Sequence, residues 1–383
     1  MVLLPSLSTA SLAIITFLSS TAYAATCTVA TGGDAATAIT NAFNSCKNGG
    51  TVVFTKGATY NLNSMVDVSG LQNTIVQFYG TINFPAYNTK YNDQSAYISI
   101  KGDQIHWDGG NVGTINGNGQ GWYNAQNHQA PTALRIQATN SYFGNFRIFQ
   151  SPRAHVGITS SDNVHLDHVT FKTVSTDSSK PAKNTDAVDI SNSKNIVFTN
   201  SNLTVGDDCT AMNNDIYNVT VSSVNCNGGH GFSIGSLGKG GSTATVKTVR
   251  ILSSTCTNCQ NGVRIKTWPG GKGSVSDIHY ESITLNKVDN PIVVTTHYCD
   301  QNQQSFCNGN DSKSLSITGV TIKGVTGSIG SASNSPVMSI NCSTGTPCSG
   351  FSITGVNVSK NANTAKNQCI NLTGSNNIPA CKA

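Results

Sequence analysis

Short segments of alternating apolar and polar residues recur along the chain from Thr51 to the C-terminus. Each segment has two β pieces around a polar or glycine corner, with Val, Ile and Leu predicted to face inward and Ser, Thr and Asn outward. The segments return about every 20 to 35 residues, a period that indicates a solenoid. The clearest copies are residues 163–171, 195–203, 218–224, 249–255, 278–285, 315–322 and 351–358.

One stretch near the start has helical periodicity instead. Ala35, Ile39 and Phe43 recur at helical spacing, Asp34 can cap the first turn, and Gly49-Gly50 can end the helix. Because a solenoid must cover its open end, we expect this short helix to close the first coil.

These patterns predict an all-β fold: a single-domain right-handed parallel β-helix with a short N-terminal capping helix. A β-sandwich would also contain many short strands, but Asn-Gly or Asp-Gly hairpin turns do not punctuate these repeats regularly. The 37 glycines and the frequent asparagines suit sharp corners between strands. No linker interrupts the repeats, so residues 25–383 are predicted to form one domain.

Residues 1–24 have the features of a secretory signal peptide. They carry no charged side chain, have an apolar centre from Leu12 to Leu18, and end in the small-x-small sequence Ala22-Tyr23-Ala24. A membrane anchor is the alternative, but the apolar run is too short to span a bilayer. No later stretch is apolar enough to span either, so we expect a secreted protein without a membrane partner.

The 12 cysteines all follow the predicted cleavage site, which suits an oxidising compartment. Zinc at Cys256 and Cys259 is the alternative, but no second CxxC follows. Sequence alone leaves the connectivity open, although most cysteines have a near neighbour. The neighbours are Cys27 and Cys46, Cys209 and Cys226, Cys256 and Cys259, Cys299 and Cys307, Cys342 and Cys348, and Cys369 and Cys381. Asn-x-Ser/Thr sequons for glycans occur at Asn202, Asn218, Asn310, Asn341, Asn357 and Asn371.

Charged residues are few, and the net charge is slightly positive. Only 11% of the residues are charged, and the formal net charge is +5. The chain has no run of Lys or Arg, which argues against a nucleic-acid partner. A mild positive excess favours a polyanionic substrate through long-range attraction.

Four polar phrases stand out against this background. They are Asn184-Thr185-Asp186, Gly206-Asp207-Asp208-Cys209, Gly229-His230-Gly231 and Arg264-Ile265-Lys266. Equivalent positions on neighbouring coils of a β-helix lie about 4.8 Å apart, so these side chains are predicted to line one groove. A single Asp more often caps a turn, and we interpret Asp189 in that way; four phrases in successive coils indicate a site.

The composition of this predicted groove points to glycosidic cleavage. Three carboxylates close together repel one another, so at least one is expected to keep its proton at a raised pKa. Glycoside hydrolysis needs one acid that protonates the leaving oxygen and another carboxylate that activates water. Arg264 and Lys266 flank Ile265 on a strand and point the same way, which indicates a substrate with its own carboxylate.

The four phrases resemble those of the polygalacturonases, glycoside hydrolase family 28, and the resemblance covers essentially the whole mature chain. It implies hydrolysis of α-1,4-linked galacturonate in pectin with inversion and without a metal or other cofactor. By motif position it makes Asp207 the general acid, and it makes Asp186 and Asp208 the pair that activates water. His230 would support the protonation state of the acid. The resemblance assigns substrate binding to Asn184, Arg264, Lys266 and Tyr298.

The residues next to the four phrases resemble exo-acting members of the family in some places and endo-acting members in others. Residues 181–183 and 268–270 are similar to fungal exo-acting members, whereas Gly229 and residues 261–264 are similar to endo-acting ones. We favour exo action, with endo action left open.

An exo enzyme needs loops that close one end of the groove. Residues 116–131 and 295–313 are two long polar insertions that fit this purpose.

Other substrates and functions stay open at this point. Xylogalacturonan or rhamnogalacturonan hydrolysis is possible within the family. A pectate lyase would share the solenoid but would need calcium and an arginine base, and His230 with the Arg-x-Lys pair fits hydrolysis better. A non-catalytic carbohydrate-binding β-helix is the alternative outside enzymes. We expect a monomer that acts on pectic polysaccharide.

Overall fold

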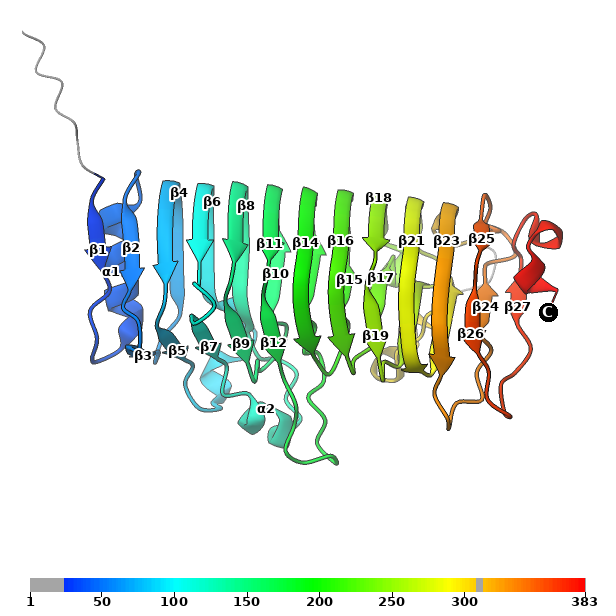
Figure 1. The fold of residues 1–383 in the computed structure, drawn as a ribbon, viewed down its shortest axis with the longest axis horizontal. Coiled ribbons are helices and arrows are strands. Elements are labelled where there is room, and N and C mark those ends of the chain that lie inside the picture. The colour runs from blue at the N-terminus through cyan, green and yellow to red at the C-terminus, as the bar shows by residue number, and fades with distance from the viewer. Residues whose placement is uncertain (1–23, 308–312, 383) are drawn as a thin grey trace, which may run out of the picture.

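A computed structural model of the protein describes residues 24–307 and 313–382. Within them, 27 strands form one continuous sheet that coils into a parallel β-helix, drawn from the N-terminal to the C-terminal end in Figure 1. The connections between stacked parallel strands are right-handed, as such connections are in general. The predicted fold is confirmed. The predicted signal peptide, apart from Ala24, lies outside the described residues.

The strands stack in three columns, one on each side of the coil. The first column contains β1 (Thr26–Thr28), β2 (Thr51–Phe54), β4 (Val66–Phe78), β6 (Ala96–Asp108), β8 (Thr132–Gly144), β11 (Asp162–Asp167), β14 (Ser193–Thr204), β16 (Ile216–Asn227), β18 (Thr243–Leu252), β21 (Lys272–Val288), β23 (Ser316–Ile329) and β25 (Ser352–Thr354). The second contains β3 (Thr59–Asn61), β5 (Thr81–Asn83), β7 (Thr114–Asn116), β9 (Arg147–Phe149), β12 (Thr170–Lys172), β19 (Thr255–Thr257) and β26 (Asn357–Ser359). The C-terminal residues of the long strands β14, β16, β21 and β23 complete this second column.

The third column carries the predicted site. It contains β10 (Val156–Thr159), β13 (Val188–Ser191), β15 (Thr210–Met212), β17 (Phe232–Leu237), β20 (Asn261–Thr267), β22 (Asn290–Thr295), β24 (Met338–Asn341) and β27 (Gln368–Ile370). Its strands present one row of side chains to the core, comprising Ile158, Ile190, Met212, Ile234, Ile265, Val294 and Ile340. The residues just before these face outward: Gly157, Asp189, Ala211, Ser233, Arg264, Val293 and Ser339. Alternation along each strand therefore separates the core from the groove.

Asparagine corners explain the sequence repeat. Asn163, Asn195 and Asn218 each adopt φ 56°, in the left-handed region that Asn tolerates better than most residues. Their side chains bond from coil to coil, with Asn218 Nδ2 donating to Asn195 Oδ1 at 2.7 Å and Asn163 Nδ2 donating to Asn140 Oδ1 at 3.0 Å. The ladder fixes the corner of each coil against the next.

The predicted capping helix is present as α1 (Ala35–Cys46), at the N-terminal end of the stack in Figure 1. Asp34 accepts a hydrogen bond from the Ala36 amide at 3.1 Å, which satisfies an amide of the first turn. Phe43 is fully buried and stacks on Trp107 with ring centroids 6.2 Å apart. The helix thus closes the open end of the apolar core.

A second helix, α2 (Gln120–Ala125), was not predicted from the sequence. It lies inside the insertion 116–131 and has one turn and a half of Gly, Asn and Gln around two aromatic residues. Trp122 and Tyr123 are buried, so tertiary packing holds this helix and intrinsic propensity does not. Short 3₁₀ turns occur at η1 (Thr89–Tyr91), η2 (Lys239–Gly241), η3 (Gln301–Phe306), η4 (Ser375–Asn377) and η5 (Pro379–Cys381).

All six neighbouring cysteine pairs form disulfides. They are Cys27–Cys46, Cys209–Cys226, Cys256–Cys259, Cys299–Cys307, Cys342–Cys348 and Cys369–Cys381. The sulfurs considered for zinc are therefore bonded to each other. Across the described residues, helices with the length and apolar character required to cross a bilayer are absent.

Candidate active site

A polar groove of about 760 Å³ runs along the outer face of the third column. Every side chain predicted for the site lines it: Asn184, Asp186, Asp207, Asp208, His230, Arg264, Lys266 and Tyr298. The acids and the histidine lie in the turns before β13, β15 and β17, and the two cations lie on β20. The structure therefore brings together residues that span more than 100 positions of sequence, because coil stacking places successive turns side by side.

Two glycines let these turns pack closely. A Cβ on Gly206 would lie 2.2 Å from the Ala182 carbonyl oxygen, and a Cβ on Gly229 would lie 2.2 Å from the Asp207 carbonyl oxygen. Gly229 also has φ +71°, which side chains rarely adopt. With both glycines in place, the His230 amide donates to the Asp207 carbonyl at 2.9 Å.

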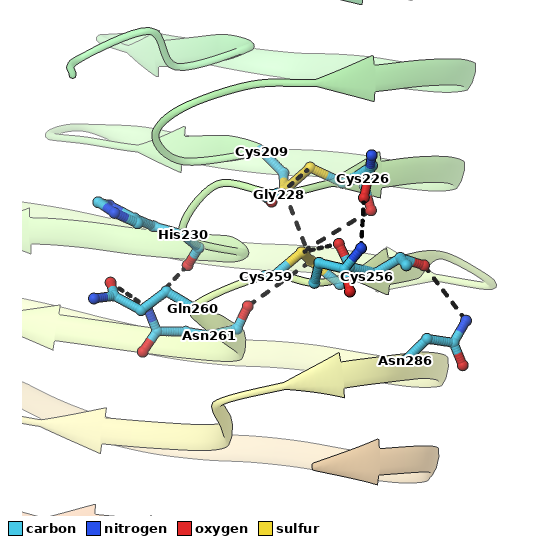
Figure 2. The surroundings of a disulfide bond; sticks show 12 residues. Cys209, Cys226, Gly228, His230, Cys256, Cys259, Gln260, Asn261 and Asn286 are labelled. Atoms are coloured by element: carbon cyan, nitrogen blue, oxygen red, sulfur yellow. Dashed lines mark hydrogen bonds between the residues drawn. A yellow bond between two sulfur atoms is a disulfide. The ribbon is translucent and has the colours of Figure 1, made fainter. Parts of the chain in front are cut away.

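Two disulfides lie next to each other near the turn that carries His230, as Figure 2 shows. Cys209 directly follows Asp208, and its bond to Cys226 ties that turn to the segment leading to His230. The Cys256–Cys259 disulfide packs against it, with Cys209 Sγ 3.8 Å from Cys256 Sγ. The Cys209–Cys226 bond holds the turn that carries Asp208, and the second disulfide packs against that bond.

Asp208 is the most enclosed carboxylate of the groove, with 3% of its side chain exposed. Lys266 Nζ lies 2.8 Å from Oδ2, Arg264 Nη1 lies 3.6 Å from Oδ1, and the Ser233 hydroxyl donates to Oδ1 at 2.6 Å. Burial alone would lower the pKa of Lys266, but the charge of Asp208 raises that pKa above its usual value. Without substrate, the two predicted cations are thus engaged with a carboxylate of the protein.

Asp207 forms a close pair with His230. Its Oδ1 lies 2.8 Å from His230 Nδ1, and its Oδ2 accepts a hydrogen bond from the Asn184 amide at 3.1 Å. Burial raises the pKa of Asp207, but the hydrogen bond and charge of His230, together with Lys266, bring it below the ordinary value. Asp207 is therefore held ionised in the substrate-free groove.

Asp186 shows the opposite behaviour. Burial, followed by the charges of Asp189, Asp207 and Asp208, raises its pKa well above the ordinary value. The expectation that one acid of the cluster has a raised pKa is confirmed. The raised pKa belongs to Asp186, however, and not to Asp207, the carboxyl to which the resemblance assigned the acid role.

The turn-cap interpretation of Asp189 was wrong. Asp189 is a strand residue of β13 that lines the groove beside Asp186. Burial and the charge of Asp208 raise its pKa to about 6, against a hydrogen bond with Asp186 that lowers it. The signal was present in the sequence, because the alternation Val188-Asp189-Ile190 already points this carboxyl outward.

His155 supports Asp186 from inside the coil. Both its amide and its ring Nδ1 donate to the Asp186 carbonyl oxygen, at 2.8 and 2.9 Å, and Nε2 lies 2.8 Å from Thr173 Oγ1. The ring is fully buried and stacks on Phe171. Burial lowers the pKa of His155 to about 4, so the ring is neutral at ordinary pH.

The insertion 295–313 supplies Tyr298. Its ring contacts Trp268 edge to face at 4.9 Å between centroids. Lys266 Nζ lies 5.4 Å and Arg264 Cζ lies 5.7 Å from the Tyr298 ring centroid, within cation–π range. Cys299, Asp300 and Gln303 of the same insertion also line the groove.

Three basic residues at the opposite end of the groove from Tyr298 were not predicted from the sequence. His128, Arg153 and Lys183 line the groove, and none of them was predicted as a site residue, although Lys183 belongs to residues 181–183 just before Asn184. Only the folded coil shows that they share a surface with the carboxylates.

Asp207, Asp208 and His230 present ligand atoms within 4.8 Å of one another, a spacing that a metal ion could use. The surroundings fit a cation poorly, since the Lys266 ammonium already lies 2.8 Å from Asp208 and His230 is bonded to Asp207. The arrangement suits proton transfer better than metal binding.

A coiled groove that combines paired carboxyls with cations is typical of a β-helical glycoside hydrolase. Residues 46–381 match the model of glycosyl hydrolases family 28, and the chain belongs to this family. An exopolygalacturonase of Rhizopus delemar is 51% identical over 364 residues, covering 95% of this chain and 94% of the relative. An exopolygalacturonase of Cochliobolus carbonum is 30% identical and covers 90% and 82%. The solved endo-xylogalacturonan hydrolase of Aspergillus tubingensis superposes with a TM-score of 0.79 at 27% identity, covering 91% of this chain and 99% of that one.

Proposed function

We propose that this protein is a secreted exo-acting polygalacturonase that hydrolyses the α-1,4-galacturonosyl linkages of polygalacturonate and releases monogalacturonate. The observation that carries the proposal is the groove itself, where carboxyls and cations that suit an anionic sugar lie together on one face. The full-length similarity to a named exopolygalacturonase supports the exo mode. The two insertions support it too, because His128 of one and Tyr298 of the other lie in the groove.

In this proposal Asp207 is the general acid, and it receives its proton from the paired His230. A bound galacturonate adds negative charge and excludes water, and both effects raise the pKa of a nearby carboxyl. With His230 doubly protonated at the start of the step, its Nδ1 proton moves to Asp207 Oδ1, which leaves a neutral imidazole, and passes from there to the glycosidic oxygen as the C–O bond breaks. The depressed pKa of free Asp207 thus describes the resting state of the acid.

Asp186 and Asp208 activate the water in this scheme. Asp208, paired with Lys266, accepts the proton from water as its oxygen attacks the anomeric carbon. Asp186, which keeps its proton at a higher pH, orients that water. Attack from the side opposite the leaving group inverts the anomeric configuration. Asn184, Arg264, Lys266 and Tyr298 bind the sugar, and the reaction proceeds without a metal.

Secretion follows in the proposal from the predicted signal peptide and the six disulfides, which need an oxidising compartment. Among the sequons, Asn202, Asn218 and Asn357 are exposed and open to glycan attachment. We infer that the mature chain, from residue 25 onward, acts as a monomer on pectic polysaccharide.

Time-resolved product analysis on polygalacturonate tests the proposal. Monogalacturonate should be the main product from the first minutes, and viscosity should fall slowly relative to the release of reducing ends. EDTA should leave the rate unchanged, and no ultraviolet-absorbing unsaturated sugar should form. An early ladder of oligomers would indicate an endo enzyme, and an unsaturated product that requires calcium would indicate a lyase. Turnover only on xylogalacturonan or rhamnogalacturonan would change the substrate, and binding without turnover would contradict an enzyme.

A further inference from the structure

The carboxyls of the groove have cations on both sides along the coil axis. Arg264 and Lys266 lie toward the C-terminal end and are engaged with Asp208. Arg153 and Lys183 lie toward the N-terminal end, in the turns that precede β10 and β13. In the described part of the chain, neither of these two side chains has a carboxylate within 4.0 Å. They are the cations of the groove that remain open to an anionic ligand.

Their place along the coils is fixed by strand register. Gly157 of β10 pairs with Asp189 of β13, and Asp189 pairs with Ala211 of β15. The turn with Arg153 is therefore one coil before the turn with Asp186 and two coils before the turn with Asp207. A rung spacing of about 4.8 Å brings these cations within reach of a sugar next to the acids.

Two segments form a wall beside these cations. Gln120 of α2 accepts a hydrogen bond from the Thr176 amide at 2.9 Å and donates to the Ser175 hydroxyl at 3.1 Å. The wall therefore joins residues 116–131 to the long turn between β12 and β13, and Figure 1 shows both extending from the same side of the coil. Trp122 anchors it through a T-shaped contact with Tyr87 at 4.8 Å. His128 and Lys183, one from each segment, line the groove.

The electrostatics of this end are positive. Burial lowers the pKa of His128, and the charges of Lys183 and Arg153 lower it further. Arg153 also opposes the rise in the pKa of Asp189. An anion placed here would relieve the repulsion between the cations and would gain charge-assisted hydrogen bonds.

We propose that Arg153 and Lys183 bind the carboxylate of one of the two galacturonates that flank the cleaved bond. This sugar is the one that lies nearer the N-terminal end of the coil, and in exo action it is the terminal sugar. The inference rests on the proposed function. Every sugar of a polygalacturonate carries a carboxylate, so a chain that crosses the acids presents one on each side. Arg264 and Lys266 serve one side, Arg153 and Lys183 serve the other, and the wall stops the chain beyond the terminal sugar.

The test removes the positive charges of Arg153 and Lys183 by substitution and the negative charge of the sugar carboxylate by esterification. Parent, Arg153→Gln, Lys183→Gln and the double variant are assayed on digalacturonate and on digalacturonate whose non-reducing residue is a methyl ester. Lys247→Gln is the matched control, because Lys247 is exposed on β18, away from the groove. The double variant should lose roughly 10- to 100-fold in kcat/KM on the free acid. It should lose little on the ester, which the parent itself should cleave poorly, and Arg153→Lys should restore part of the rate.

Variants within about twofold of the parent, or equal losses on both substrates, would overturn the inference while leaving the proposed function intact. Calorimetric binding of monogalacturonate gives a readout independent of turnover. The parent should bind it and the double variant should not, with equal melting temperatures. Equal binding by both proteins would also overturn the inference. A parent that cleaves neither substrate would instead contradict the proposed function, and the calorimetric comparison would still decide the role of the two cations.

Discussion

Two adjacent carboxyls, Asp207 and Asp208, meet different surroundings although the chain places them side by side. Asp207 points to a half-exposed imidazole, whereas Asp208 points to an enclosed ammonium. The first arrangement can exchange a proton with its partner, and the second holds a charge in place. This difference supports separate roles in the proposed mechanism.

Asp207→Asn should lower kcat by about 10²- to 10⁴-fold with little change in KM, because an amide cannot protonate the leaving oxygen. Initial rates on polygalacturonate measure it. The matched control is Asp215→Asn, an exposed turn residue with positive φ before β16, which should retain the parent rate. Asp207→Asn activity within about tenfold of the parent would remove Asp207 from the acid role.

Lys266→Met should affect stability as well as activity. It leaves the buried Asp208 carboxylate with Arg264 and the Ser233 hydroxyl, and breaking one partner of a buried ion pair costs about 3–5 kcal/mol of unfolding free energy. Adding Asp208→Asn should return most of that stability while activity stays lost. Urea unfolding and initial rates together measure the two effects. A stable single variant, or an active double variant, would contradict the pairing described here.

Seven of the eight predicted site residues lie in phrases of distinctive composition, Tyr298 came from the family resemblance, and all eight line the groove. The sequence could not predict which of the carboxyls has the raised pKa. The pKa of Asp186 depends on burial and on charges from other coils, which only the fold provides. Arg153 was missed for a related reason, since a lone cation in a turn has no local signature, and Lys183 was noted only as part of residues 181–183.

At the scale of elements, the strands were predictable and the insertions were not. Alternation recurs from coil to coil, and the corner keeps a left-handed residue, such as Asn195, Asn218, Thr248 or Gly319, so each copy reinforces the prediction. The helix α2 follows no such pattern, because its Trp122 is held by contact with Tyr87 from another coil. The six disulfides join neighbours in sequence because each closes a short turn within or between adjacent coils.

The turn before β10 gives a prediction about pH. His155 has its pKa lowered to about 4 by burial, whereas in the unfolded chain it would protonate near its ordinary value of 6.5. The stability provided by the neutral ring is thus complete above pH 6.5 and is lost as pH falls toward 4. Relative to His155→Gln, the parent should lose about 3 kcal/mol of unfolding free energy between pH 7 and pH 4.

Urea unfolding at several pH values measures this difference. Asp186 and Asp189, whose pKa values are raised, gain stability over the same range as pH falls, but they do so in both proteins and cancel in the comparison. A difference between parent and variant that stays constant with pH would show that His155 does not titrate as its burial requires.

At the scale of the molecule, the β-helix turns a linear order of phrases into a linear groove. One end of that groove holds Tyr298 from the insertion 295–313, and the other holds His128 from the insertion 116–131 and the wall around α2. The core beneath is one continuous apolar cluster of aliphatic and aromatic residues, and Trp122 and Tyr123 of the insertion 116–131 are part of it. Exo action is the proposal that gives a role to the insertions at both ends of the groove.

The most direct measurement follows hexagalacturonate that carries a label at its reducing end. If the wall stops the chain beyond its terminal sugar, the enzyme should release unlabelled monogalacturonate from the non-reducing end. The label should then pass in order through the pentamer, tetramer and trimer. Label that appears early in trimer and dimer together would show internal cleavage, and label in the monomer at the first time points would show attack from the reducing end. Either of these results would contradict the account.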